Sequence, residues 1–341
     1  MMIMNGLSLA IYWIGAVLIN DAQDMQGKFT LFSDMVVFSS YAMQVVMSFM
    51  MLVMIFIMLP RASVAAKRIL EVLDTEPSIE DGTRDTFPVM KDGEVEFKDV
   101  SFKYPDAEEY VLEHISFSAK KGETIAFIGA TGCGKSTAIN LIPRFYDATE
   151  GEVFVDGVNV KEYTQEALHN KIGYVSQKAI LFSGTIADNV AYGENGKAPA
   201  TQDDIAMAVK VAQASEFVEK KDQGYDGYVA QGGSNFSGGQ KQRLSIARAI
   251  ARQPEILIFD DSFSALDYKT DRILREALRK ECKDATKIIV AQRIGTIRDA
   301  DKIIVLDDGQ IAGMGTHDEL MKNCEVYQEI AYSQLSKEEL A

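Results

Sequence analysis

Apolar residues dominate the first 60 or so positions, whereas the rest of the chain mixes apolar and polar side chains. Residues 36–59 contain no charged side chain, and residues 3–19 are interrupted only by Asn5, Ser8 and two glycines. At about 1.5 Å per helical residue, such stretches approach or exceed a hydrocarbon core of about 30 Å. The pattern predicts two membrane spans joined by a polar connection at 20–30, in an antiparallel hairpin. A signal peptide is the alternative for the first stretch, but its basic start and small-residue cleavage site are lacking.

The periodicity changes after the apolar part. A helical continuation runs to Leu73, and strand-like alternation begins near Gly93. Later runs predict strands at 124–128, 171–175, 256–259, 287–290 and 302–306, and helices around 135–142, 202–214, 238–252 and 270–282. Such alternation predicts an α/β fold with a largely parallel sheet and an antiparallel part before residue 120. We expect a membrane part at 1–74, a linker at 75–93, a body at 94–335 and a tail at 336–341.

The charged residues argue against one class of partner and predict the orientation of the chain in the membrane. The net charge of −15, without a basic run, argues against nucleic acid as a partner. Arg61, Lys67 and Arg68 follow the second span closely, so the positive-inside tendency predicts a cytoplasmic body. The three cysteines are widely spaced and suggest neither a disulfide framework nor a zinc site.

A phosphate-binding motif follows the strand expected at 124–128. Residues 129–137, Gly-Ala-Thr-Gly-Cys-Gly-Lys-Ser-Thr, match the P-loop pattern and lead into a helix. Backbone N–H groups of such a loop surround phosphates, Lys135 reaches the β- and γ-phosphates, and Ser136 supplies a ligand for Mg²⁺. Asp260, at the end of a buried strand, is the second expected Mg²⁺ ligand. ATP and Mg²⁺ are therefore the expected cofactors, and the nucleotide-binding candidates are Gly129, Thr131, Gly132, Cys133, Gly134, Lys135, Ser136 and Thr137.

A second motif identifies a family. Residues 234–243, Ser-Asn-Phe-Ser-Gly-Gly-Gln-Lys-Gln-Arg, closely resemble the signature of ATP-binding-cassette (ABC) proteins, usually LSGGQ with a basic tail. The resemblance covers residues 94–335 and implies an ABC ATPase, with an antiparallel β subdomain and a helical subdomain. It implies that Tyr104 stacks on adenine, that Gln177 contacts Mg²⁺ and links the site to the membrane part, and that residues 264–267 form the D-loop with Asp267. Two such cassettes stack head to tail, so the signature residues Ser237, Gly238, Gly239 and Gln240 would face ATP bound by a partner.

The apolar part fits the same family. The two spans and residues 60–64 look like the last two transmembrane helices of an exporter-type ABC half. The resemblance implies four preceding spans, so a start at Met1 suggests a fragment, a split gene or a misplaced start. It also implies a multi-pass protein of the plasma membrane that contacts lipid and exports a solute, which these residues do not identify.

Two positions depart from the family pattern. Asp261 stands where the family has a glutamate that orients or deprotonates the attacking water, and Gln292 stands where it has a histidine. A shorter carboxylate misplaces the base, and an amide carries no positive charge. Both changes resemble the impaired half of heterodimeric exporters, with a second ABC half-transporter as partner. The catalytic candidates are Asp261, Gln292 and Gln177.

Three alternatives remain open from the residues. The chain could be a regulatory or vestigial fragment that binds nucleotide and transports nothing. It could be a soluble ABC ATPase without a transport role, although the two spans argue against this. A homodimeric exporter with two slow sites is the third alternative, and a neighbouring gene with the expected Glu and His would exclude it.

Overall fold

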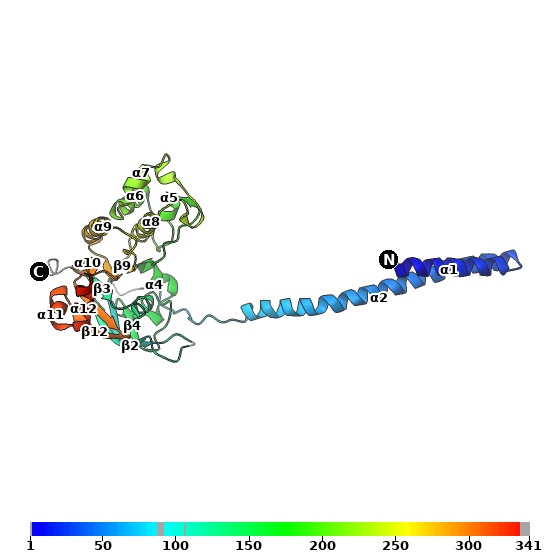
Figure 1. The fold of residues 1–341 in the computed structure, drawn as a ribbon, viewed down its shortest axis with the longest axis horizontal. Coiled ribbons are helices and arrows are strands. Elements are labelled where there is room, and N and C mark those ends of the chain that lie inside the picture. The colour runs from blue at the N-terminus through cyan, green and yellow to red at the C-terminus, as the bar shows by residue number, and fades with distance from the viewer. Residues whose placement is uncertain (1, 87–91, 106, 335–341) are drawn as a thin grey trace. The chain divides into compact units, whose positions relative to one another are not determined.

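The computed structural model describes residues 2–86, 92–105 and 107–334 (Figure 1). The chain divides into two compact units, Met1–Ser78 and Ile79–Ala341, and each is described by itself. The expected tail at 336–341 lies outside the described residues.

The N-terminal unit consists of two antiparallel helices, α1 (Met2–Asp21) and α2 (Met25–Leu73). Both are long and apolar enough to cross a membrane, a test of length and composition only, and their side chains are not buried. The polar connection is shorter than expected: α2 already begins at Met25, because the Asp24 carboxylate accepts a hydrogen bond from the Gly27 N–H at 3.1 Å and caps the helix. The expected helical continuation to Leu73 is confirmed.

A six-stranded sheet forms the centre of the second unit. Its order is β12-β11-β3-β10-β9-β6, and all neighbours are parallel except β12 and β11. The five parallel strands are β3 (Thr124–Ile128), β6 (Ile172–Val175), β9 (Ile256–Asp260), β10 (Thr286–Val290) and β11 (Lys302–Asp307). They confirm the strands expected from the apolar runs. The antiparallel edge strand β12 (Gln310–Gly315) was not expected, since its sequence mixes glycines with exposed positions.

An antiparallel sheet of order β2-β1-β4-β5 lies beside the parallel one. Its strands are β1 (Val95–Phe102), β2 (Leu112–Ala119), β4 (Glu150–Val155) and β5 (Val158–Asn159). The expectation that the antiparallel part precedes residue 120 is therefore incomplete. β4 follows the phosphate loop in sequence and returns to pair with β1, and only tertiary folding brings these segments together.

Two hydrophobic clusters cover the two faces of the parallel sheet. Along β3, Ile125 and Phe127 pack with the antiparallel sheet, whereas Ala126 and Ile128 belong to the other cluster, which includes residues of α8. The alternation follows from the two-residue period of a strand. Because both faces are buried, each strand is mostly apolar, and polar residues such as Lys287 and Asp307 stand near the strand ends.

Helices connect and cover these strands, and Figure 1 shows α5, α6 and α7 gathered at one end of the unit, far from α11 and α12. The helices are α3 (Lys135–Asn140), α4 (Gln165–Lys171), α5 (Ile186–Val190), α6 (Gln202–Val211), α7 (Ser215–Glu219), α8 (Gly238–Ala251), α9 (Tyr268–Glu281), α10 (Ile294–Ile297), α11 (His317–Asn323) and α12 (Glu325–Gln334). Short 3₁₀ turns lie at Val160–Glu162, Gly224–Asp226 and Gln231–Gly233, and β7 (Gly184–Thr185) pairs with β8 (Tyr228–Val229).

Part of the expected linker packs on the second unit. The Gly82 N–H donates to the Tyr163 carbonyl at 3.1 Å, and the Gln165 N–H donates to the Asp81 carboxylate at 2.6 Å. The boundary between the units accordingly falls after Ser78, earlier than the expected domain start near Gly93. Residues 87–91 of the expected linker lie outside the described residues.

Candidate nucleotide-binding and hydrolytic site

The phosphate loop lies between β3 and α3, at the carboxyl end of the parallel sheet. Gly129 has φ 152° and Gly134, the N-cap of α3, has φ 95°, a conformation that favours glycine. A Cβ at Gly129 would also collide with the Leu306 carbonyl oxygen of β11. The loop therefore needs glycine at both positions for its tight turn.

Lys135 directs its ammonium into this loop. Its Nζ donates to the carbonyl oxygens of Gly129 at 2.9 Å and Ala130 at 2.6 Å, and the residue is only 8% exposed. The cation thus lies among the residues that would surround the phosphates of a nucleotide.

Ser136 and Asp260 meet across the sheet. The Ser136 hydroxyl donates to Oδ1 of Asp260 at 2.7 Å, and Asp260 also accepts from the Tyr174 hydroxyl at 3.4 Å. Burial raises the pKa of Tyr174, and the Asp260 carboxylate raises it further, so the phenol stays a donor. A hydroxyl and a carboxylate are the hard oxygen ligands that Mg²⁺ accepts, so this pair fits the ion. The pattern of the sequence did not indicate Tyr174, which lies on β6.

The next residue, Asp261, accepts hydrogen bonds from two side-chain amides. Its Oδ2 accepts from Nε2 of Gln292 at 2.8 Å and from Nε2 of Gln177 at 3.3 Å. Burial raises the pKa of Asp261, while hydrogen bonds from Gln177, Ser264 and Gln292 act in the opposite direction. All three catalytic candidates therefore converge, although they come from distant parts of the sequence. The Gln177 amide contacts Asp261 rather than the Ser136–Asp260 pair.

Tyr104 lies beside the phosphate-loop helix. Its hydroxyl is 3.1 Å from Oγ1 of Thr137, and its ring stands edge-on to those of Phe102 and Tyr146. An aromatic ring at this place can offer a face to a base next to the phosphate site.

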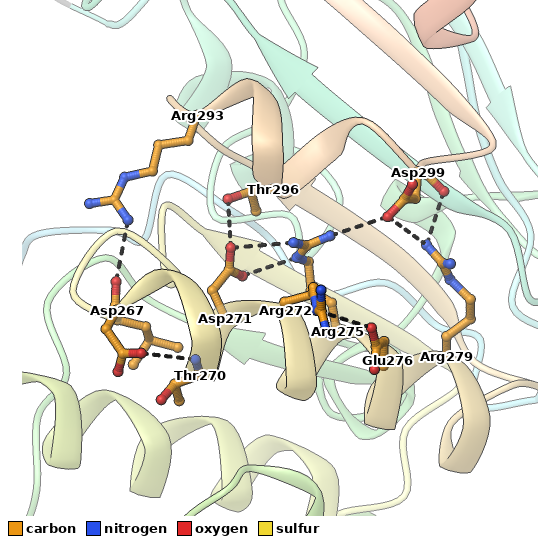
Figure 2. Close-up of polar contacts among 11 residues, drawn as sticks. Asp267, Thr270, Asp271, Arg272, Arg275, Glu276, Arg279, Arg293, Thr296 and Asp299 are labelled. Atoms are coloured by element: carbon orange, nitrogen blue, oxygen red, sulfur yellow. Dashed lines mark hydrogen bonds and ion pairs between the residues drawn. The ribbon is translucent and has the colours of Figure 1, made fainter. Parts of the chain in front are cut away.

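The signature residues open α8. Ser237 caps the helix through a capping box with Gln240, in which the Ser237 hydroxyl accepts from the Gln240 N–H and the Gln240 side chain accepts from the Ser237 N–H. A Cβ at Gly239 would lie 3.1 Å from the Ala265 carbonyl oxygen, so the signature adjoins the D-loop. Asp267 caps α9 by accepting from the Thr270 N–H at 3.0 Å (Figure 2).

A strand, a phosphate loop and a helix, with a carboxylate from a second strand against the loop hydroxyl, define a P-loop nucleotide-binding protein. Residues 112–264 match the sequence model of the ABC transporter family. The second unit therefore contains an ATPase domain of the ABC transporter family.

The chain is similar to named ABC transporter proteins and to a solved exporter structure. An uncharacterized ABC transporter ATP-binding protein of Mycobacterium tuberculosis is 45% identical over 331 residues, which are 97% of this chain and 56% of the relative. The ATP-dependent lipid A-core flippase of Haemophilus influenzae is 42% identical over 276 residues, 81% of this chain and 46% of the flippase. The structure of a bacterial Atm1-family ABC exporter with ATP bound matches with a TM-score of 0.79 and 32% identity, covering 98% of this chain and 58% of that one.

These similarities confirm the expected resemblance to an exporter-type half-transporter and the expected fold class. The chain spans about half the length of these relatives, from 46% to 58%. Exporter relatives place it at a membrane.

Proposed function

We propose that this chain is the ATP-binding part of an exporter half that works with a second ABC half-transporter. In this proposal, binding of MgATP between two cassettes drives export of a solute through a membrane pathway. The observation that carries it is the Ser136–Asp260 pair, which joins the phosphate loop to the end of β9 in the arrangement that binds a nucleotide with its metal. The names of the relatives include a lipid flippase and a multidrug export protein. The proposal assigns no particular solute to this chain.

Each group at the phosphate loop has a role in this proposal. Lys135 neutralises charge on the β- and γ-phosphates, and the N–H groups at the start of α3 bind the phosphate oxygens. Ser136 and Asp260 hold Mg²⁺, which when bound neutralises the phosphate charge. Tyr104 stacks on the adenine ring. Gln177 joins the hydrolytic site to the membrane part.

In this proposal, the ATP site formed by the phosphate loop of this chain hydrolyses ATP slowly. A general base must come within about 2.6–3.2 Å of the proton that it takes, and the Asp261 side chain is one methylene shorter than glutamate. The Gln177 and Gln292 amides donate to its Oδ2 and orient the carboxylate, but they do not restore the missing methylene. Gln292 can donate a hydrogen bond to a phosphate but cannot carry positive charge.

The nearly intact signature serves the ATP of the partner in this proposal. Among the described residues, the hydrogen bonds of Ser237 and Gln240 stay within the start of α8 and do not reach the phosphate loop. Their helix N-terminus is thereby available as an anion site for a second cassette. One productive ATP site would then combine this signature with the phosphate loop of the partner.

The location of the two units follows from the same proposal. The apolar helices α1 and α2 are proposed as spans of a multi-pass protein of the plasma membrane, with the ATPase domain in the cytoplasm. The intact chain is expected to fractionate with membranes, whereas a chain without residues 1–74 is expected to be soluble and to bind ATP. Recovery of the intact chain in the soluble fraction without detergent would contradict the spans.

Restoring the two missing groups tests the impaired site. The combined change Asp261→Glu and Gln292→His is expected to raise hydrolysis at this site by at least about tenfold, because 1 Å of misplacement can cost about 100-fold. The measurement is single-turnover hydrolysis in the reconstituted complex, with the P-loop lysine of the partner replaced by alanine. Adding Lys135→Ala should remove the gain. An unchanged rate despite intact MgATP binding would count against the proposed impairment.

A further inference from the structure

The last turn of α12 contacts the backbone next to the hydrolytic site. Nε2 of Gln334 donates to the Gln292 carbonyl oxygen at 2.7 Å, and Oε1 of Gln334 accepts from the Ile294 N–H at 2.9 Å. One amide side chain thus satisfies two backbone groups on either side of Arg293. We call residues 292–294 the switch segment. Pairing of this kind needs a donor and an acceptor on one side chain, and glutamine has both.

The D-loop also contacts the switch segment. The Arg293 guanidinium donates to the carbonyl oxygens of Leu266 at 3.3 Å and Ser264 at 3.2 Å. Figure 2 shows this side chain reaching toward the start of α9. The switch segment therefore shares its contacts between two parts of the chain that are distant in sequence.

A buried polar network continues this attachment. The Thr296 hydroxyl donates to Oδ2 of Asp271 at 3.0 Å, and Asp271 pairs with Arg275 at 3.0 Å (Figure 2). The Asp271 and Arg275 side chains are 2% and 9% exposed, so a low dielectric surrounds the pair. These contacts attach α10 to α9. The switch segment is therefore held by α9 through α10 and by α12 through Gln334.

We propose that Gln334 is a positioning residue for the hydrolytic site. It holds the backbone of the switch segment so that the Gln292 amide stays at Asp261, and it thereby makes hydrolysis depend on the docking of α12. Among the described residues, the side-chain hydrogen bonds of Gln334 go to the backbone of this segment, so Gln334 acts through Gln292. The inference rests on the proposed function, because it concerns hydrolysis at the own site of this chain.

Alternative causes are separated by the choice of variants. Gln334→Ala removes both hydrogen bonds, and Gln334→Glu keeps an acceptor for the Ile294 N–H but sets a carboxylate against the Gln292 carbonyl oxygen. Gln328→Ala is the matched control: its side chain lies on the same helix and donates to the Met321 carbonyl oxygen at 2.9 Å, away from the switch segment. A loss caused only by a weakened α12 would appear in Gln328→Ala as well.

The first measurement is single-turnover hydrolysis over hours in the full complex, with the partner's P-loop lysine replaced by alanine. We expect Gln334→Ala and Gln334→Glu to lower kcat about tenfold, below the roughly 100-fold cost of a 1 Å misplacement, since Arg293 still holds the other side. The affinity for MgATP should stay within about twofold, because Gln334 does not contact the phosphate loop. Gln328→Ala should match the wild type.

Comparing kcat with the affinity for MgATP gives a readout that a merely structural loss would not reproduce. A weakened fold would lower both values together, whereas a displaced Gln292 amide lowers kcat and leaves the affinity in place. Gln328→Ala should leave both values unchanged.

Hydrogen exchange of the Ile294 amide tests the contact without hydrolysis. We expect exchange at least about tenfold faster in Gln334→Ala than in the wild type or in Gln328→Ala. Equal exchange in Gln334→Ala and wild type would overturn the contact, and faster exchange with unchanged kcat would overturn the positioning role. A wild-type complex that binds no MgATP would instead defeat the proposed function, and the exchange result would still decide whether Gln334 holds the switch segment.

Discussion

The start of α8 offers a sharp test of which ATP each part of the chain serves. Gly239 lies in the first turn of this helix, and a Cβ there would be 3.1 Å from the Ala265 carbonyl oxygen and 3.8 Å from Cδ2 of Leu266. Gly239→Asp places a carboxylate at the N–H groups that are proposed to meet the γ-phosphate of the partner's ATP. Losing one donor aimed at developing negative charge costs about 2.7–4 kcal/mol, or about 100- to 1,000-fold. We therefore expect turnover of the complex to fall at least about 100-fold.

The fold should tolerate this change, so the loss can be assigned to the site. An acidic side chain near a helix N-terminus is favourable by about 0.3–1 kcal/mol, which offsets part of the crowding at 3.1 Å. Gly239→Ala is the matched control, since it brings the same Cβ without the charge. Its turnover is expected to fall less than about tenfold, and both variants should unfold near the wild-type temperature.

Lys135→Ala should behave differently in the same complex. It removes a cation from the phosphate loop of the impaired site, and a hydrogen bond to a charged group is worth about 1.5–3 kcal/mol. MgATP binding at this site should weaken about 10- to 100-fold. Much of the steady-state ATPase activity should survive, because the faster hydrolysis uses the phosphate loop of the partner.

Steady-state ATPase activity of the reconstituted complex is the assay, with photo-crosslinking of an ATP analogue to report binding at each chain. If Lys135→Ala abolishes turnover while Gly239→Asp leaves it near normal, the division of roles between the two chains is wrong. Most hydrolysis would then take place at the ATP site formed by the phosphate loop of this chain.

Three further outcomes follow from single side chains. Tyr104→Ala should weaken ATP binding by about 1–3 kcal/mol, the value of stacking on a base, whereas Tyr104→Phe should bind within about twofold of wild type, as equilibrium binding of a fluorescent ATP analogue would report. Arg275→Ala leaves the Asp271 carboxylate buried without its charged partner and should destabilise the second unit by about 3–5 kcal/mol in denaturant unfolding; an effect below about 1 kcal/mol would contradict this account. Because burial raises the pKa of Asp261, folding favours its protonated form, so stability is lost as pH rises from about 3.8 through the raised pKa. Asp261→Asn should lack this loss. Thermal unfolding measured against pH is the test, and parallel curves for the two proteins would contradict the reasoning.

The elements that depend on neighbouring residues were predictable from the sequence. The phosphate loop is continuous from Gly129 to Thr137, so its strand, turn and helix are all encoded in one stretch. The five parallel strands were evident because a strand covered on both faces is a mostly apolar run. The end of α2 at Leu73 matches the helical continuation expected after the second span, and the helix runs through Pro60.

The pairing of distant segments was decided by the tertiary structure. Nothing in residues 150–159 indicates that β4 must return to β1, because pairing depends on the backbone of the partner strand. The meeting of Gln177 and Gln292 at Asp261 could be expected only from the family resemblance, and their hydrogen bonds to one carboxylate oxygen could not.

The contact of Gln334 with the switch segment had no sequence signal at all. A side-chain amide that binds backbone groups 40 and 42 residues away leaves no periodicity and no motif. The sequence by itself thus determined which local elements form and which residues carry the chemistry. The tertiary structure decided which of those residues share one site, because contacts between distant segments depend on how the sheet and its helices pack.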